Sequence, residues 1–198
     1  MKSLGGVVYL NGKATSEMKE TEIAKSLSMV MTEHIHPELM SCRDVVATGR
    51  YPYTGRLGIL DKQDWKLVDE AITMVHAEEV AEQSFTRISD GQRQRVMLAR
   101  AICQDTAILV LDEPTSYLDI RYKLDILNSI RKLARERNIA VIMSLHELDL
   151  VQKVSDMVAC VDGTTVSHIG PPEEIFQGSL VQTVSYTHLR AHETSAHL

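Results

Sequence analysis

The sequence of 198 residues contains no long apolar run, and no stretch approaches the roughly 20 residues that a membrane-spanning helix needs. It also lacks a basic start followed by an apolar stretch, so no secretion signal is predicted. The three cysteines, Cys42, Cys103 and Cys160, are far apart and form no Cys-x-x-Cys pair. Their odd number and their spacing predict neither a disulfide framework nor a zinc site, and they favour a reducing, cytoplasmic location.

Positive charge is also scarce, because 21 Lys and Arg residues stand against 27 Asp and Glu residues, a net charge of −6. A general nucleic-acid binder normally carries a basic surface, so no nucleic-acid partner is expected. Hydrophobic residues make up 44% and charged residues 24% of the chain, which is typical of a folded globular protein and argues against disorder.

The two ends of the chain differ from its middle. Three of the eight histidines fall in Val184–Leu198, which has neither helical nor strand periodicity and resembles the translation of a sequencing adapter. We therefore expect a domain over residues 1–183 and a non-native tail over 184–198. Near the start, Asn11 and Gly12 follow a short β-rich run, a pattern that predicts a hairpin turn. A chain that opens in a hairpin is expected to lack its N-terminal part.

Short apolar runs alternate with stretches of helical periodicity along most of the chain, which predicts an α/β fold with a mostly parallel sheet. A structured loop rich in Gly, Pro and Tyr is expected over residues 49–58. The expected strands cover residues 28–31, 107–111, 139–143, 157–161 and 165–169; the expected helices cover 21–27, 41–49, 61–75, 77–83, 91–103, 120–135, 147–154 and 173–176.

Two adjacent carboxylates, Asp112 and Glu113, follow the wholly apolar run over residues 107–111. Ligands bind at the carboxyl edge of a parallel sheet, where this run would deliver both side chains. One carboxylate can hold Mg²⁺ through water, and the other can orient or deprotonate a water that attacks a phosphate. A strand that simply runs into an acidic loop or helix cap explains this pattern equally well.

Two further patterns point to phosphate chemistry. Ser89, Gly91 and Gln92 stand at the start of a predicted helix, where a hydroxyl, free N–H groups and the helix dipole favour an anion. An ordinary serine cap followed by a glycine is the alternative. His146 follows the predicted strand over 139–143 and can reach a terminal phosphate there, although a lone histidine is more often structural.

Taken together, these patterns resemble the ATP-binding subunit of an ABC transporter. Residues 89–92 match the signature sequence, with Asp90 in place of the commoner glycine. Residues 108–112 match the Walker B strand, Glu113 the catalytic carboxylate, residues 116–119 the D-loop and His146 the switch histidine. The resemblance covers residues 7–183, and the order and spacing of four motifs make it specific.

The resemblance implies a P-loop NTPase-like core with a helical subdomain inserted at about residues 41–84, and ATP and Mg²⁺ as the bound groups. Asp112 would hold the Mg²⁺, Glu113 would act on the water, and His146 would sense the γ-phosphate. Asp119 would report across the interface of a head-to-tail dimer. The residues that would close on ATP bound to the other copy are Ser89, Asp90, Gly91 and Gln92. The helical subdomain would press on a membrane permease, which places the subunit peripherally on the inner face of the cell membrane.

Two departures from the family pattern matter. The phosphate-cradling loop, G-x-x-x-x-G-K-[ST], is absent; the stretch from Gly6 to Lys13 has five residues between its glycines and no Ser or Thr after the lysine. The chain by itself is therefore expected to be inactive. The family also has a glutamine after the strand over 28–31, where this chain has Thr32 and Glu33, either of which is a candidate metal contact.

The stretch Gly49–Gly55 and residues 112–121 resemble the ATPases of iron–siderophore, haem and vitamin B12 importers. Two alternatives remain at this stage. One is a soluble ABC-type ATPase of translation or DNA repair, which would carry tandem domains or long coiled coils, and the chain shows neither a repeat nor heptads. The other is a binding or regulatory module, or an inactive fragment, without catalysis.

Overall fold

The computed structural model describes residues 5–31, 37, 39–55, 58–162 and 165–176. The chain divides into two compact units, residues 1–144 and 145–198, and each is described by itself. The expectations for Thr32, Glu33 and the tail over 184–198 lie outside the described residues. Within the described ranges, no helix combines the length and the apolar character that crossing a bilayer requires.

The first unit contains a parallel sheet in the order β3-β4-β5, formed by Leu27–Val30, Ile108–Leu111 and Ala140–Met143. The register aligns Val30 with Leu111 and Leu111 with Met143, so all three strands end at one edge. The α/β class and the parallel sheet predicted from the sequence are confirmed. This edge is where the two adjacent carboxylates emerge.

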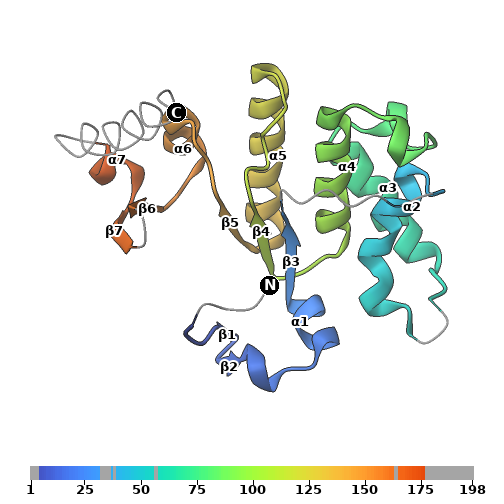
Figure 1. Cartoon of the computed structure of the whole chain (residues 1–198), viewed down its shortest axis with the longest axis horizontal. Helices are drawn as coiled ribbons and strands as arrows, with labels where there is room; N and C mark the ends of the chain where they lie inside the picture. The colour runs from blue at the N-terminus through green and yellow to red at the C-terminus, as the bar shows by residue number, and fades with distance from the viewer. Residues whose placement is uncertain (1–4, 32–36, 38, 56–57, 163–164, 177–198) are drawn as a thin grey trace, which may run out of the picture. The chain divides into compact units, whose positions relative to one another are not determined.

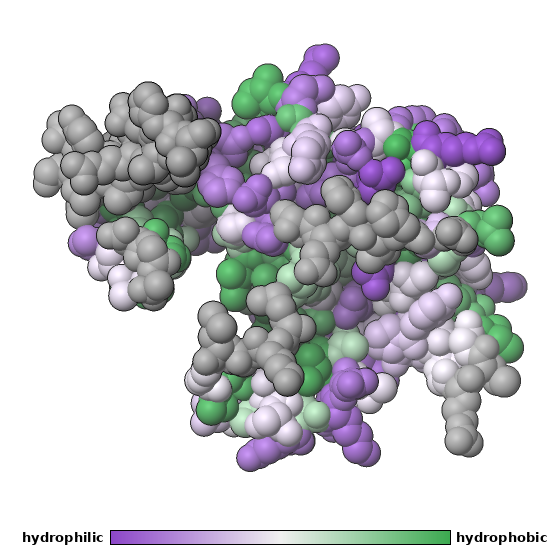
Figure 2. Space-filling model, viewed as in Figure 1, coloured by the Kyte–Doolittle hydropathy of each residue, from purple (hydrophilic) through white to green (hydrophobic). Residues whose placement is uncertain are grey.

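The two faces of this sheet have different surroundings. Val30, Leu109 and Leu111 point to one face and are buried. On the other face Met29, Val110 and Ile142 are neighbours in register, and we call these three residues the outer row. Met29 is 44% exposed and Ile142 is 61% exposed. Figure 2 shows hydrophobic residues gathered over β5 in this view.

Helices cover the buried face. Figure 1 shows α2 (Cys42–Ala47), α3 (Lys62–Met74) and α4 (Asp90–Cys103) side by side, and α4 also contacts β3. The apolar face of α5 (Ile120–Arg137) joins the same core. The largest fully buried side chains of these helices include Val45, Val46, Val68, Leu98, Ile126 and Ile130. The 3₁₀ helix η2 (Thr48–Tyr53), which follows α2, packs tightly against α4, because a Cβ atom at Gly49 would overlap the carbonyl oxygen of Arg100.

The predicted hairpin near the start is confirmed. β1 (Tyr9–Leu10) pairs antiparallel with β2 (Lys13–Ala14). Asn11 and Gly12 between them have φ angles of 50° and 79°, as a two-residue turn with two positive φ angles requires. The 3₁₀ helix η1 (Thr15–Glu17) and α1 (Glu20–Ser26) then lead into β3.

Two local predictions were wrong. The helix expected over 77–83 is only a 3₁₀ turn, η4 (Glu78–Val80), followed by a second one, η5 (Phe85–Arg87). The carbonyls of Ala81 and Gln83 accept the N–H groups of Arg43 and Cys42 at the start of α2, so they do not continue a helical ladder. The segment expected as a loop from residue 49 begins instead with the 3₁₀ helix η2 (Thr48–Tyr53).

The second unit comprises α6 (Leu148–Val154), β6 (Val158–Asp162), β7 (Thr165–Gly170) and α7 (Pro172–Ile175). β6 and β7 form an antiparallel hairpin with a register shift between Cys160 and Val161. Leu150, Val154 and Ile175 are buried.

All three cysteines are free thiols. Burial raises the pKa of Cys42 to about 11 and that of Cys103 to about 12, whereas the side chain of Cys160 is only partly buried.

Candidate functional site

Asp112 and Glu113 emerge where β4 ends, directly beside the end of β5. The Ser144 hydroxyl, which follows β5, donates to Asp112 Oδ1 at 2.8 Å. The Ser144 Oγ in turn accepts the Glu113 N–H, also at 2.8 Å. On the other side, the Asp112 N–H donates to the Val30 carbonyl at 2.9 Å, which continues the pairing with β3. Ser144 therefore fixes both carboxylate-bearing residues against the neighbouring strand.

Glu113 is held in an unusual backbone conformation. Its φ is 47°, a left-handed value that is uncommon for a residue with a side chain. The Ser116 hydroxyl donates to Glu113 Oε2 at 2.9 Å, and the Gln94 Nε2 amide donates to the Glu113 carbonyl at 3.3 Å. Such conformations persist where the surroundings over-determine them, and they are common at functional sites.

The donor atoms at this edge suit a hydrated divalent cation. Asp112 and Ser144 offer oxygen atoms, which Mg²⁺ prefers, and Mg²⁺ usually keeps several waters and takes one or two carboxylates. The described residues contain no group of three or more His, Cys, Asp or Glu side chains placed to hold a metal. The donor set therefore fits Mg²⁺ held through water and does not form an all-protein cage.

The start of α4 carries the residues that the sequence assigned to phosphate binding. Ser89 is the N-cap: its Oγ accepts the Gln92 N–H at 3.3 Å, and Gln92 Oε1 accepts the Ser89 N–H at 2.9 Å. The serine cap that the sequence offered as an alternative to phosphate binding is thus present in the structure. Ser89 and Asp90 are nevertheless exposed, and the Asp90 carboxylate pairs with Arg93 at 2.6 Å. Their role toward ATP stays a prediction.

The residues after Glu113 run along the start of α4. A Cβ atom at Gly91 would lie 3.1 Å from the Tyr117 carbonyl oxygen. Tyr117 is 70% exposed and has a φ of 63°. Asp119 caps α5, because its Oδ1 accepts the N–H groups of Arg121 and Tyr122, each at 3.1 Å. The structure thus brings Gly91 and the 116–119 segment together within one copy; the role of Asp119 across an interface stays a prediction.

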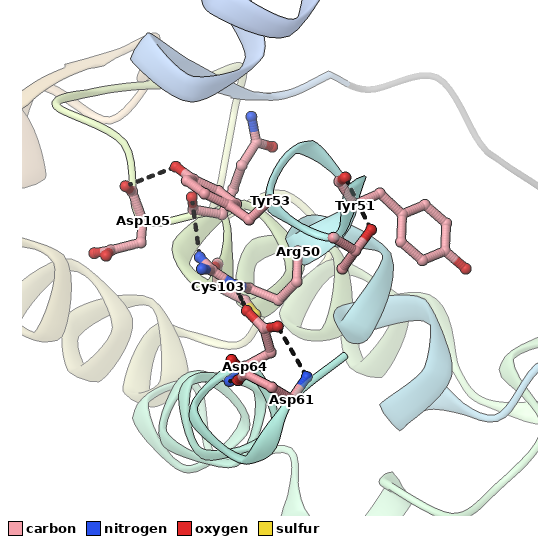
Figure 3. Close-up of polar contacts among 9 residues, drawn as sticks. Arg50, Tyr51, Tyr53, Asp61, Asp64, Cys103 and Asp105 are labelled. Atoms are coloured by element: carbon pink, nitrogen blue, oxygen red, sulfur yellow. Dashed lines mark hydrogen bonds and ion pairs between the residues drawn. The ribbon is translucent and has the colours of Figure 1, made fainter. Parts of the chain in front are cut away.

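A buried arginine anchors the segment that begins at Gly49. Arg50 is 6% exposed, donates to the Cys103 carbonyl at 2.9 Å and pairs with Asp64 at 2.9 Å (Figure 3). Its guanidinium also lies 4.1 Å from the centre of the Tyr53 ring. The arginine therefore ties η2 to the start of α3 and to the end of α4, while Tyr51 stays exposed.

Opposing effects act on Asp64. Burial raises the pKa of this carboxyl, but hydrogen bonds from Arg50 and from the Asp61 N–H, together with the Arg50 charge, lower the pKa below its usual value. The Asp64 carboxylate is therefore charged at neutral pH.

The sequence pattern gave no individual role to Ser144, Ser116, Gln94 or Arg50, all of which contact the candidate residues or anchor their helices. A usable signal existed only for Ser144, which directly follows the strand expected beside 107–111. His146 belongs to the second unit, so its proposed role rests on the sequence pattern alone.

The chain is similar to known proteins in both sequence and fold. The family model described as "ABC transporter" matches residues 1–116. The chain is 40% identical over 181 residues to an uncharacterized ABC transporter ATP-binding protein of Methanocaldococcus jannaschii, covering 91% of this chain and 62% of that protein. It is 34% identical over 185 residues to the iron(3+)-hydroxamate import ATP-binding protein of Bacillus subtilis, covering 93% and 68%.

Among solved structures, the dimeric structure of an ATP-binding cassette bound to ADP and Pi aligns with a TM-score of 0.75 at 21% identity. That alignment covers 85% of this chain and 74% of the other, and it supports the fold. The chain spans 62% of the first relative's length and 68% of the second's.

Proposed function

Because this chain belongs to the ABC transporter family, we propose that it is part of the ATP-binding and ATP-hydrolysing subunit of an importer. The cargo would be an iron complex, such as a siderophore or haem, or cobalamin. The likeness to an iron(3+)-hydroxamate import protein supports this class, as does the stretch Gly49–Gly55. The cargo itself would be bound by other subunits, so no residue here is assigned to it.

The observation that carries the proposal is the pair Asp112 and Glu113 at the carboxyl edge of a parallel sheet, fixed by Ser144. Asp112 would hold Mg²⁺ through water; the ion would neutralise charge on the phosphates. Glu113 would accept a proton from the attacking water or orient it. His146 would contact the γ-phosphate, and Thr32 or Glu33 would contribute near the metal.

We further propose that two copies bind head to tail around ATP. Ser89, Gly91 and Gln92 of one copy would close on ATP held by the other, since the start of α4 is a helix N-terminus with an exposed serine, a place that favours an anion. Asp90 lies in the same turn, and Arg93 balances its charge. Asp119 would contact the second copy across this interface.

The subunit would work at the inner face of the cell membrane, bound to a permease through its helical subdomain over residues 41–84. Exposed Tyr51 and the η2 segment anchored by Arg50 lie within that subdomain. The chain as given, without a phosphate-cradling loop, would not hydrolyse ATP at an appreciable rate, because the β- and γ-phosphates lose their main cradle.

The test uses a complete subunit, namely residues 1–183 preceded by the phosphate-binding segment of an ABC transporter ATP-binding protein. Glu113→Gln keeps the side-chain size and removes the basic carboxylate. We expect Mg²⁺-dependent ATP hydrolysis to fall about 10²- to 10⁴-fold, the usual contribution of a general base, with ATP binding retained. Glu136→Gln, an exposed glutamate on α5, is the matched control. If Glu113→Gln hydrolyses ATP at a rate near that of the unmodified complete subunit, Glu113 does not have the role assigned to it.

A further inference from the structure

We propose that Gln94 and Gly91 are positioning residues for Glu113 of the same copy. In this proposal α4 has two roles. Its capped first turn faces ATP bound to the second copy, and one side of the helix packs against residues 113–118 of the same copy. The proposal rests on the function proposed above. It assigns to Gln94 a role that the signature sequence does not include, because Gln94 lies two residues beyond Gln92.

The first contact is at Glu113 itself. The Gln94 Nε2 amide, partly buried, donates to the Glu113 carbonyl at 3.3 Å, across 19 residues of sequence. The backbone of Glu113 is in the left-handed region, with a φ of 47°. A residue with a side chain stays there only when neighbours hold it. Ser144 holds the N–H, Ser116 holds the carboxylate, and Gln94 holds the carbonyl.

The second observation is a close approach of Gly91 to the far end of the same segment. The site of a Cβ atom on Gly91 lies 3.1 Å from the Tyr117 carbonyl and 3.5 Å from Leu118 Cδ2. Tyr117 is also left-handed, with a φ of 63°. Residues three apart share one face of a helix, so Gly91 and Gln94 present a single face of α4 to both ends of the 113–118 segment.

This arrangement couples the two nucleotide sites of the proposed dimer. Ser89 and Gly91 belong to the first turn that would meet ATP on the second copy, whereas Gln94, one turn further, contacts Glu113 of its own copy. A displacement of the first turn would therefore change how Glu113 is held. Because coupling free energies are reciprocal, the state of the 113–118 segment would equally affect binding of the second copy's ATP.

The test replaces Gln94 by Met, which has a similar length and no N–H donor. In the chain as given, we expect faster amide hydrogen exchange over residues 113–118, with exchange in β4 and β5 unchanged. Gln83→Met is the matched control, because the Gln83 amide donates to the Glu79 carbonyl at 2.9 Å in an exposed turn. Gly91→Ala is the second variant, and its methyl group should speed exchange at residues 117 and 118.

In the complete subunit, Gln94→Met should lower kcat about threefold to tenfold, the range set by one hydrogen bond, with KM for ATP unchanged. Gln94→Lys, which keeps an N–H donor, should recover part of that loss. Unchanged exchange over 113–118 in both Gln94→Met and Gly91→Ala, or a change in KM alone, would overturn the proposal. A complete subunit without any ATPase activity would instead refute the proposed function, and the exchange measurements would still decide the positioning role.

Discussion

Arg50 and Asp64 form a buried ion pair whose disruption should lower the stability of the fold. Their side chains are 8% and 12% exposed and their atoms lie 2.9 Å apart. Asp64→Asn would leave the arginine charge without its carboxylate partner, which costs about 3 kcal/mol of unfolding free energy for a buried pair. Chemical denaturation of the chain measures this difference. Asp69→Asn, which breaks the exposed Arg43 pair, should cost less than about 1 kcal/mol.

The same pair predicts a pH dependence with a defined sign. Because the pKa of Asp64 is lower in the folded chain than its usual value of 3.8, the pair contributes stability above that pH. The contribution is lost as the pH falls through the folded pKa. Denaturation of the unmodified chain and of Asp64→Asn should therefore converge only below that folded pKa, which lies under 3.8. Equal pH dependence of the two proteins would contradict the assignment.

At the residue scale, the sequence predicts which two carboxylates form the candidate site. It does not predict the hydrogen bonds that hold these two residues in place. Asp112 and Glu113 are recognisable because an apolar strand precedes them. The contacts of Ser144 and Gln94 span 32 and 19 residues, and Arg50 reaches Cys103 over 53. Contacts at such separations depend on how the elements pack, which local periodicity does not encode.

At the scale of elements, two roles of Ser89 at the start of α4 can be distinguished by mutation: capping of the helix and the proposed binding of phosphate. Ser89→Ala removes the cap and should cost about 1 kcal/mol, seen as a lower thermal midpoint and faster exchange of the Gln92 amide. Ser89→Asp retains a cap, because aspartate also accepts the N–H groups at a helix start. Its free energy of unfolding should therefore stay within a few tenths of a kcal/mol of that of the unmodified chain. In the complete subunit Ser89→Asp should nevertheless lose ATP-driven dimerisation, because its charge repels phosphate. Normal dimerisation by Ser89→Asp would show that Ser89 is a cap alone.

Elements with strong periodicity were predicted well, and those shaped by their neighbours were not. The three parallel strands and the helices α3, α4 and α5 follow directly from apolar spacing and caps. The segment over 77–83 did not form a helix, because its carbonyls are taken by the N-terminus of α2. Such competition between backbone partners is decided in three dimensions.

For the molecule as a whole, the exposed outer row should cause self-association of the chain as given. Parallel sheets normally have both faces covered, yet Met29 and Ile142 are 44% and 61% exposed. Ile142→Ser should lower the weight-average mass measured by sedimentation at equal concentration, since it removes apolar surface worth about 1 kcal/mol per copy. Ile59→Ser, at a side chain 69% exposed outside the sheet, is the control. Equal masses for the unmodified chain and Ile142→Ser would exclude the outer row as the cause.

Because two of the three cysteine thiols are buried, thiol-reactive reagents should modify the native chain at one cysteine only. Thiolates react with maleimides and oxidants, and with pKa values of about 11 and 12 Cys42 and Cys103 stay protonated and covered at neutral pH. Alkylation of the native chain should therefore modify Cys160 on β6, which attaches a fluorophore to the second unit without any engineered cysteine. Modification of the other two would occur only when α2 and α4 separate, so the number of labels per chain records the opening of the helical layer.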